Sequence, residues 1–334
     1  MNTIQRDTYW DTARAVLMWL VILGHTIQLM LNDIFQSYPL FKGIYIFHLP
    51  VFFFISGYFA ITGIQKHQWK RLLTTTQRLL YPVFTIGTIQ ALLTIHKGDY
   101  QLTSILSCYI CLWFLWSLFE CHVCAHVLLS FKGSVWRVSF LILPIFLSMI
   151  LRGYIPYASY LSYSWPFFLM GMYFRHKGFS HKDITNRLYW LLPAAALAFC
   201  IFKDDWYIYF TPLDLTIKSW GIATFRFVSA LVCGSVFLAI IKSFYSKLNI
   251  SKIGAATLGI YVVQCIICNT VLILKLTGSI HNIIAIIIIS LVTFVASYYI
   301  YLITKKIPFA GKMLYGEIVN NTKTSDKEEF PRKL

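Results

Sequence analysis

The sequence predicts an all-α integral membrane protein with about ten transmembrane helices and both termini in the cytoplasm. Of the 334 residues, 58% are hydrophobic and only 13% are charged, which is too few charged residues to cover a soluble globule of this size. The mean hydropathy is +0.65, and several apolar runs reach the roughly 20 residues that a spanning helix requires. The lipid bilayer is therefore the expected solvent for most of the chain.

Ten apolar runs are the candidate spans. The fourth is unusually long and is interpreted as one tilted helix. The fifth and sixth are short and contain Pro144 and Pro166, so each is a candidate for a re-entrant or broken helix. In order, the runs cover about residues 12–31, 44–63, 80–95, 104–129, 135–151, 160–174, 188–202, 219–241, 253–274 and 282–304.

The positive charge follows the topology that these spans predict. The formal net charge is +16, from 29 lysines and arginines against 13 acidic residues. With both termini in the cytoplasm, the inner segments contain 22 of the 29 basic residues, the outer segments contain six, and Arg226 lies within a span. This asymmetry is what the positive-inside rule requires. Nucleic-acid binding is not needed to explain the charge.

The membrane domain is expected to cover residues 1–316. Its polar start leads into a full-length apolar span without a small-residue cleavage pattern, so no cleavable signal peptide is expected. Residues 317–334 are mostly polar and charged, and they are predicted to form a disordered cytoplasmic tail.

Three C-x-x-C pairs raise the question of a metal site. Two of them lie close to His122 and His126, a combination that would suit zinc. The stretch that holds both pairs is interpreted as one apolar helix, in which Cys108 and Cys121 would be about 20 Å apart. No metal site is therefore expected, and the cysteines are interpreted as packing residues. The pairs are Cys108 with Cys111, Cys121 with Cys124, and Cys265 with Cys268.

The first span contains two ionisable residues on one face. Arg14 and His25 are eleven residues apart, which is almost three helical turns or about 16 Å along the axis. Asp11 precedes Arg14 by one turn and is expected to pair with it. Ionisable groups at the depth of His25 are functional candidates. The alternative is that His25 bonds a neighbouring helix and that Arg14 only extends to the membrane interface.

The second span adds another histidine. His48 is expected about four residues from the outer end of this helix, and His25 about six residues from the outer end of the first, so the two imidazoles should lie at similar depth. Neutral imidazole suits general-base catalysis near neutral pH. The alternative is that His48 is an interface residue before Pro50.

Six stretches of the chain resemble the membrane acyltransferase-3 family. The histidine-containing second stretch is closest to the fucose 4-O-acetylase-like branch of that family, and the resemblance covers roughly residues 7 to 310. The stretches are "DTARAVLMWLVILGH", "FHLPVFFFISGYF", "RLLYP", "LWFLWSLF", "FFLMGMYF" and "IGAATLGIYVVQ".

The resemblance implies an O-acyltransferase in a bacterial inner membrane. Such an enzyme moves an acetyl or similar small acyl group from cytoplasmic acyl-CoA to a sugar hydroxyl of a surface polysaccharide or its lipid-linked precursor. Arg14 and His25 match the family's paired functional positions, and Arg78 matches the second arginine of its R-x-x-R motif. Thr75 stands where the first arginine of that motif is common, with Arg71 one turn earlier. Gln264 stands where many relatives have a late histidine.

Acyl transfer to an alcohol requires a base, an oxyanion donor and alignment of two substrates, and it needs no metal. His25 is the predicted base, with His48 supporting its tautomer or binding the acceptor. Arg14, held by Asp11, is expected to bind the phosphates of acetyl-CoA with Arg71 and Arg78, because guanidinium offers several fixed donors. The alternative for Arg71 and Arg78 is ordinary positive-inside charge.

A second class of function stays open. A protein with ten spans and intramembrane histidines could be a proton-coupled transporter or a glycan exporter. The sequence shows no internal repeat of the kind that such transporters often have, which favours the enzyme. Glu120 lies within an apolar run and has three candidate situations, namely a pair with Arg226, a pair with His122, or a helix interface.

Overall fold

Every element that the computed structural model describes is helical. The described residues are 7–66, 68–109, 112–130, 134–151, 154, 158–183, 186–273 and 282–316. The helices are α1 (Thr8–Leu31), η1 (Asn32–Ser37), α2 (Pro39–Lys66), α3 (Gln68–His96), α4 (Leu102–Tyr109), α5 (Trp113–Ser130), α6 (Ser134–Ile150), α7 (Ala158–His176), η2 (His181–Asp183), η3 (Asn186–Leu191), α8 (Leu192–Ile201), α9 (Ile217–Phe244), α10 (Ser251–Gly254), α11 (Thr257–Ile273), α12 (Ile283–Thr304) and α13 (Pro308–Tyr315).

Six of the described helices are long and apolar enough to cross a membrane. They lie within α1, α2, α3, α5, α9 and α12. Shorter apolar helices occur at Leu141–Ile150, Leu188–Ile201 and Thr257–Cys268. The all-helical prediction is confirmed, whereas the count of ten crossings and the cytoplasmic termini stay predictions. The predicted tail, residues 317–334, lies outside the described residues.

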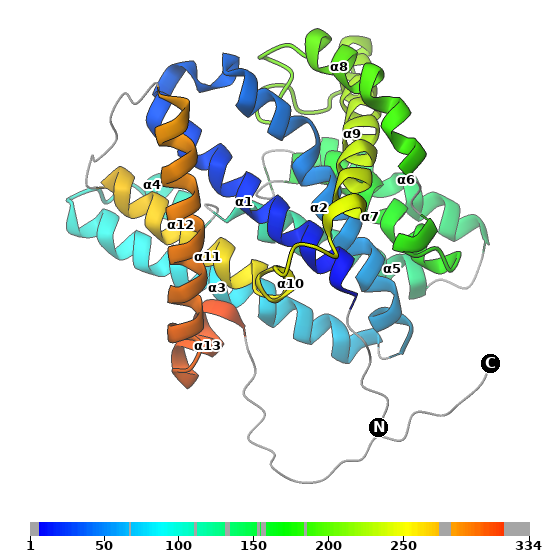
Figure 1. Cartoon of the computed structure of the whole chain (residues 1–334). Coiled ribbons are helices and arrows are strands. Elements are labelled where there is room, and N and C mark those ends of the chain that lie inside the picture. Colours follow the sequence, from blue (N-terminus) through cyan, green and yellow to red (C-terminus); the bar gives the residue numbers. More distant parts are fainter. Residues whose placement is uncertain are drawn as a thin grey trace, which may run out of the picture.

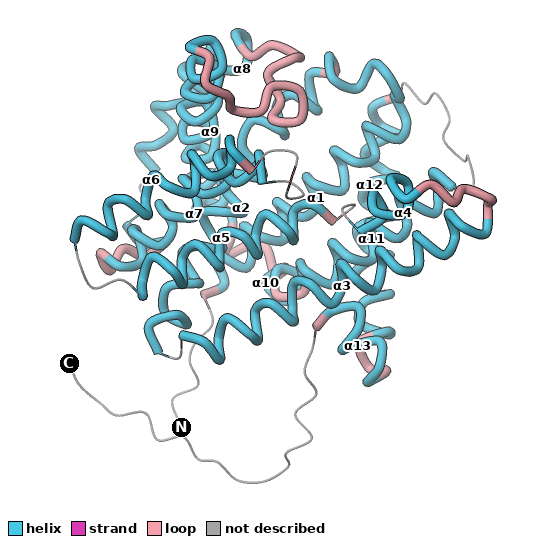
Figure 2. Tube along the Cα trace, turned by 180° about the vertical axis from the view of Figure 1, so that it is seen from behind, coloured by secondary structure: helices cyan, strands magenta, loops and turns pink. Residues whose placement is uncertain are grey.

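The first two helices lie in the middle of the bundle. In Figure 1, α1 and α2 lie between α12 on one side and the pair α8 and α9 on the other. The helix α1 contacts α2, α10, α11 and α12, and its side chains Tyr9, Trp10, Leu17 and Ile22 are completely buried. Seen from behind in Figure 2, α3 lies beside α13 and α4. The most amino-terminal span is thus the centre of the fold.

Two glycines explain why α2 and α7 pack so closely. A Cβ atom at Gly57 would overlap the backbone oxygen of Phe168, and one at Gly171 would overlap that of Phe54. The stretches "FFFISG" and "FFLMG" therefore form the two sides of one helix crossing, in which small residues let the backbones meet. The helix α7 is continuous through Pro166, and α6 is continuous through Pro144.

The fourth apolar run is not one helix, so that prediction was wrong. The helix α4 ends at Tyr109, and α5 begins at Trp113. The indole Nε1 of Trp116 donates to the backbone oxygen of Tyr109 at 2.9 Å, which satisfies one of the carbonyl groups that a helix end leaves unpaired. The helix α4 packs on α3. The helix α5 also packs on α3, and in addition it packs on α7. The distance argument against a shared metal, which assumed one helix, therefore does not apply.

The second helix is longer than its apolar run indicated. It begins at Pro39, so His48 lies nine residues from its start, rather than four. Proline is favoured in the first turn of a helix, and α2 therefore includes residues 39–43, which precede the predicted run.

Candidate active site

One cavity gathers most of the residues that the sequence singled out. It has a volume of about 250 Å³ and is lined by side chains from α1, α2, α3, α5 and α11 and from the connection between α8 and α9. Of the six predicted site residues, five line it, namely Arg14, His25, His48, Arg71 and Arg78. These residues come from three helices, so the fold brings them together.

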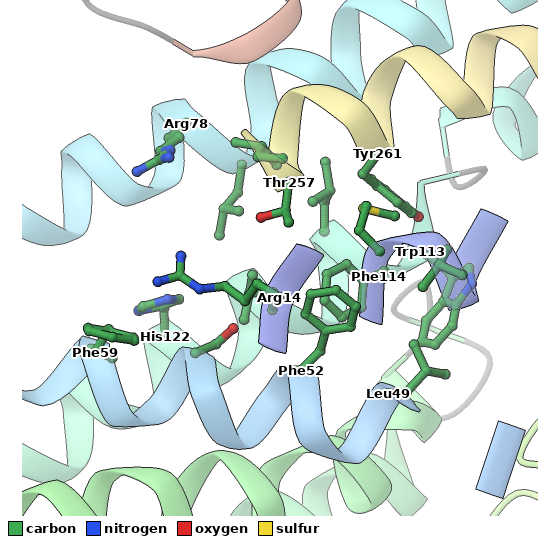
Figure 3. Close-up of a pocket in the computed structure, with 18 of the residues that line it drawn as sticks. Arg14, Leu49, Phe52, Phe59, Arg78, Trp113, Phe114, His122, Thr257 and Tyr261 are labelled. Atoms are coloured by element: carbon green, nitrogen blue, oxygen red, sulfur yellow. The ribbon is translucent and has the colours of Figure 1, made fainter. Parts of the chain in front are cut away.

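Arginines gather at one end of the cavity. Figure 3 shows Arg14 and Arg78 at the same end as Phe59 and His122, with Trp113 at the opposite end. Arg71 is exposed, like Arg78, and both line the same cavity. This end therefore carries three positive charges that reach solvent.

Asp11 lies outside the cavity lining and acts on it through Arg14. Its Oδ1 accepts from Nη2 of Arg14 at 2.9 Å, and Asp11 is only 1% exposed. The Arg14 guanidinium also lies 4.9 Å from the centre of the Phe59 ring. Gly254 of α10 packs against the backbone oxygen of Asp11, so close helix packing holds the start of α1 in place. The predicted pair between Asp11 and Arg14 is confirmed.

The second and third arginines share one face of α3. Arg71, Thr75 and Arg78 follow each other by four and three residues, which is the spacing of a helical face, and all three line the cavity. Gly316 ends α13 with φ +60° and packs against the backbone of Arg78. The last described helix therefore supports the part of α3 that carries Arg78.

His25 has its ring orientation set by a residue far away in the sequence. Its Nδ1 lies 3.0 Å from Oε1 of Gln264 on α11. Because an amide oxygen only accepts hydrogen bonds, Nδ1 carries the proton and Nε2 is left as the acceptor. Gln264 is completely buried, and its Nε2 donates to Sγ of Cys265 at 2.9 Å. Gln264 stands where the family resemblance implies a histidine in many relatives, and in the structure it is a partner of His25.

His48 presents a second acceptor nitrogen to the same cavity. Its Nδ1 donates to the backbone oxygen of Ile44 at 2.8 Å, so its Nε2 is the acceptor in the neutral ring. The Tyr45 ring packs edge-on against the imidazole with centroids 4.6 Å apart. Both histidines of the first two helices therefore line the cavity with Nδ1 held by an acceptor, which leaves Nε2 as the acceptor in the neutral ring.

Two further histidines line the arginine end of the cavity. His122 and His126 are one turn apart on α5, and Nδ1 of His126 donates to the backbone oxygen of His122 at 2.7 Å. Within the described residues, Nε2 of His126 and Nδ1 of His122 are buried without a hydrogen-bond partner. Their spacing by four residues places both histidines on one face of α5, which could have indicated that they line the cavity together. From the sequence alone, they are interpreted only as candidate zinc ligands. No three His, Cys, Asp or Glu side chains in the described part of the chain gather closely enough to hold a metal.

Glu120 is not part of this arrangement. Both of its carboxylate oxygens are buried and have no hydrogen-bond partner among the described residues. Neither of the two ion pairs that the sequence left open, with Arg226 or with His122, is therefore present in the structure.

Aromatic side chains line the end of the cavity opposite the arginines. Trp113 and Tyr209 line it, and Tyr160 packs against both. The ring centroids of Trp113 and Tyr160 are 4.9 Å apart, and those of Tyr160 and Tyr209 are 5.9 Å apart. Tyr209 comes from the connection between α8 and α9, a segment without an apolar pattern that would have indicated its position.

A cavity with guanidinium groups at one end and oriented imidazoles further along suits a substrate that joins a phosphate group to a reactive centre. Residues 7–302 match the family model that is described as an acyltransferase domain. The chain belongs to the acyltransferase-3 family.

Two curated relatives share part of their length with this acyltransferase-3 chain. The nodulation protein NolL of Mesorhizobium japonicum is 27% identical over 229 residues, which cover 62% of this chain and 60% of the relative. The nodulation protein NolL of Sinorhizobium fredii is 28% identical over 227 residues, which cover 61% of this chain and 60% of the relative. The match thus spans about three fifths of each relative. No solved structure matches the chain significantly.

Proposed function

We propose that this acyltransferase is a membrane O-acetyltransferase that moves an acetyl or small acyl group from cytoplasmic acyl-CoA to a sugar hydroxyl. The observation that carries this proposal is the single cavity that joins three guanidinium groups to His25. Family membership supports acyl transfer. The proposal also includes the acceptor class, which is a surface polysaccharide or its lipid-linked precursor. It places the enzyme in a bacterial inner membrane.

The arginine end of the cavity binds the donor. Arg14, Arg71 and Arg78 contact the phosphates of the coenzyme, because guanidinium groups bind phosphate through paired hydrogen bonds. Asp11 holds Arg14 in position through the 2.9 Å ion pair. The pantetheine arm then follows α1 for about 16 Å to His25, so that the nucleotide stays in the cytoplasm while the thioester enters the membrane.

His25 is the general base. Its Nε2 takes the proton of the sugar hydroxyl as the hydroxyl oxygen bonds to the thioester carbonyl carbon, and the carbon–sulfur bond then breaks to release the coenzyme thiolate. The proton on His25 passes to that thiolate, so the reaction consumes no other reagent. Nε2 of His48 accepts a hydrogen bond from the acceptor sugar, and Trp113 and Tyr209 provide aromatic faces against which a sugar ring packs.

Transfer of label from acetyl-CoA tests the proposal. Purified protein in lipid nanodiscs is incubated with acetyl-CoA labelled in the acetyl group and with polysaccharide precursor extracted from a strain that lacks the protein. We expect label in the glycan fraction, together with release of free coenzyme A. A transporter or exporter would leave the label on the donor, and that result would contradict the proposal.

A further inference from the structure

Arg226 is a buried cation that the acyl-transfer cavity does not use. It lies on α9, is 5% exposed, and is absent from the residues that line that cavity. Its Nη1 makes one long hydrogen bond, of 3.5 Å, to the backbone oxygen of Trp206. Its Nε is buried without a partner, and no carboxylate pairs with the guanidinium in the part of the chain that the structure describes. A buried charge at membrane depth is unfavourable unless something compensates it.

Two further cavities have Arg226 in their lining. The larger one has a volume of about 250 Å³, lies between α6, α7, α9 and the connection before α9, and is lined mainly by apolar side chains such as Phe167, Trp220 and Phe227. The other is a small cavity of about 10 Å³. Tyr163 and Arg226 line both. The charge therefore lies at the inner end of an apolar chamber.

The small cavity lies between this chamber and the acyl-transfer cavity, because it shares lining residues with both. Tyr45, Leu49 and Tyr209 line the small cavity and the acyl-transfer cavity. One layer of side chains thus separates Arg226 from the cavity that contains His25 and His48. On the outer side, Trp220 and Thr224 line the apolar chamber and are exposed, which places its rim on the surface of the bundle.

We propose that this chamber binds a phosphate-bearing lipid, with its phosphate on Arg226 and its hydrocarbon chain among the apolar side chains. Charge complementarity selects an anion, because a guanidinium without a carboxylate partner binds phosphate through paired hydrogen bonds. The apolar lining and the exposed rim select an anion that carries a hydrocarbon chain and enters from the bilayer. This inference rests on the proposed function for one point: a sugar linked to that phosphate would extend past Tyr209 towards His25 as the acceptor.

Binding of decyl phosphate tests the site without any acyl transfer. Isothermal titration of the full chain in detergent compares decyl phosphate, decanol and inorganic phosphate on the wild type, Arg226→Gln, Arg226→Lys and the control Lys218→Gln, which removes an exposed charge from the same helix. We expect Arg226→Gln to weaken decyl phosphate binding by about tenfold or more, as loss of a charged hydrogen bond predicts. Arg226→Lys should lose less, Lys218→Gln should match the wild type, and decanol binding should be equal in all four proteins.

Two results would overturn the proposal. One is decyl phosphate binding by Arg226→Gln that equals that of the wild type. The other is inorganic phosphate binding as tightly as decyl phosphate, which would indicate a site for free phosphate. If Arg226→Gln does not fold, the wild type decides the question, because it must bind decyl phosphate at least about tenfold more tightly than decanol.

The acyl-transfer assay separates this inference from the proposed function. If the chain transfers acetyl groups, Arg226→Gln should raise the KM for a lipid-linked acceptor and leave the KM for acetyl-CoA unchanged. If the chain transfers none, the proposed function fails, and the titration still shows whether the lipid site exists.

Discussion

At the scale of single residues, the central feature is a histidine oriented by an amide. Gln264 holds Nδ1 of His25 at 3.0 Å without placing a charge inside the membrane, where an ionised carboxylate would be unfavourable. The shared face of Arg14 and His25 could be predicted, because helical geometry alone relates two residues eleven positions apart. The partnership with Gln264 could not be predicted, because the two residues are 239 positions apart in the sequence.

Replacing Gln264 should slow acyl transfer without weakening donor binding. Gln264→Leu removes the acceptor that selects the tautomer of His25, and we expect kcat to fall by about tenfold, as loss of a hydrogen bond of about 1.5 kcal/mol predicts. Gln264→Glu keeps an acceptor oxygen and should retain more activity. Steady-state kinetics of both variants measure the effect. A wild-type kcat in Gln264→Leu would show that the amide does not position the base.

Arg14 should act on the donor and leave the acceptor unaffected. Arg14→Ala removes a charged hydrogen-bond donor for phosphate, so we expect the KM for acetyl-CoA to rise by about tenfold to a hundredfold. Asp11→Asn should give a smaller rise, because it only loosens the Arg14 side chain. Kinetics with each substrate varied in turn measure both constants. Equal changes in the donor and acceptor constants would count against a phosphate role for Arg14.

At the scale of helices, apolar runs indicated the main elements but not every boundary. The run that became α4 and α5 contains neither glycine nor proline between Cys108 and Trp113, so nothing local indicated the break, which depends on packing against different neighbours. The prolines of α6 and α7 had the opposite effect, since they indicated broken helices that the structure shows as continuous.

The crossing of α2 and α7 should be sensitive to a single methyl group. Gly57→Ala and Gly171→Ala each force a Cβ into the backbone of the other helix, and we expect each to destabilise the fold by about 1–3 kcal/mol. Gly221→Ala on α9 is the matched control, because a Cβ there meets nothing within 4 Å. Thermal unfolding in detergent measures all three. Equal melting temperatures for the crossing variants and the control would show that the two backbones can separate without loss.

At the scale of the whole molecule, the sequence indicates more crossings than the described helices establish. Six described helices are long and apolar enough to cross a membrane. The remaining predicted spans correspond to α6, α8 and α11, which are shorter, and to α7, which has 19 residues but is not among the six. Hydropathy and charge bias predict how the chain crosses the bilayer. They do not predict which side chains meet inside the bundle, and for that reason the two histidines of α5 and Tyr209 were missed as cavity residues.

Reporter fusions should show alternating sides along the chain. The ten-span topology places Lys97 and Lys203 outside and Lys177 and Lys247 inside. Alkaline phosphatase, which is active only outside the cytoplasm, should be active when fused after the first pair. A fluorescent protein that matures only in the cytoplasm should be bright after the second pair. The reverse pattern at any of these positions would require a different number of crossings.

The most direct test of the central claim measures donor binding and acyl transfer on the same variant. The claim is that one cavity joins a phosphate-binding end to a separate base. His25→Ala should therefore bind acetyl-CoA with the wild-type Kd while its rate of acetyl transfer falls by about a hundredfold to ten-thousandfold. Wild-type turnover by His25→Ala would contradict the claim, as would a loss of acetyl-CoA binding as large as the loss of transfer.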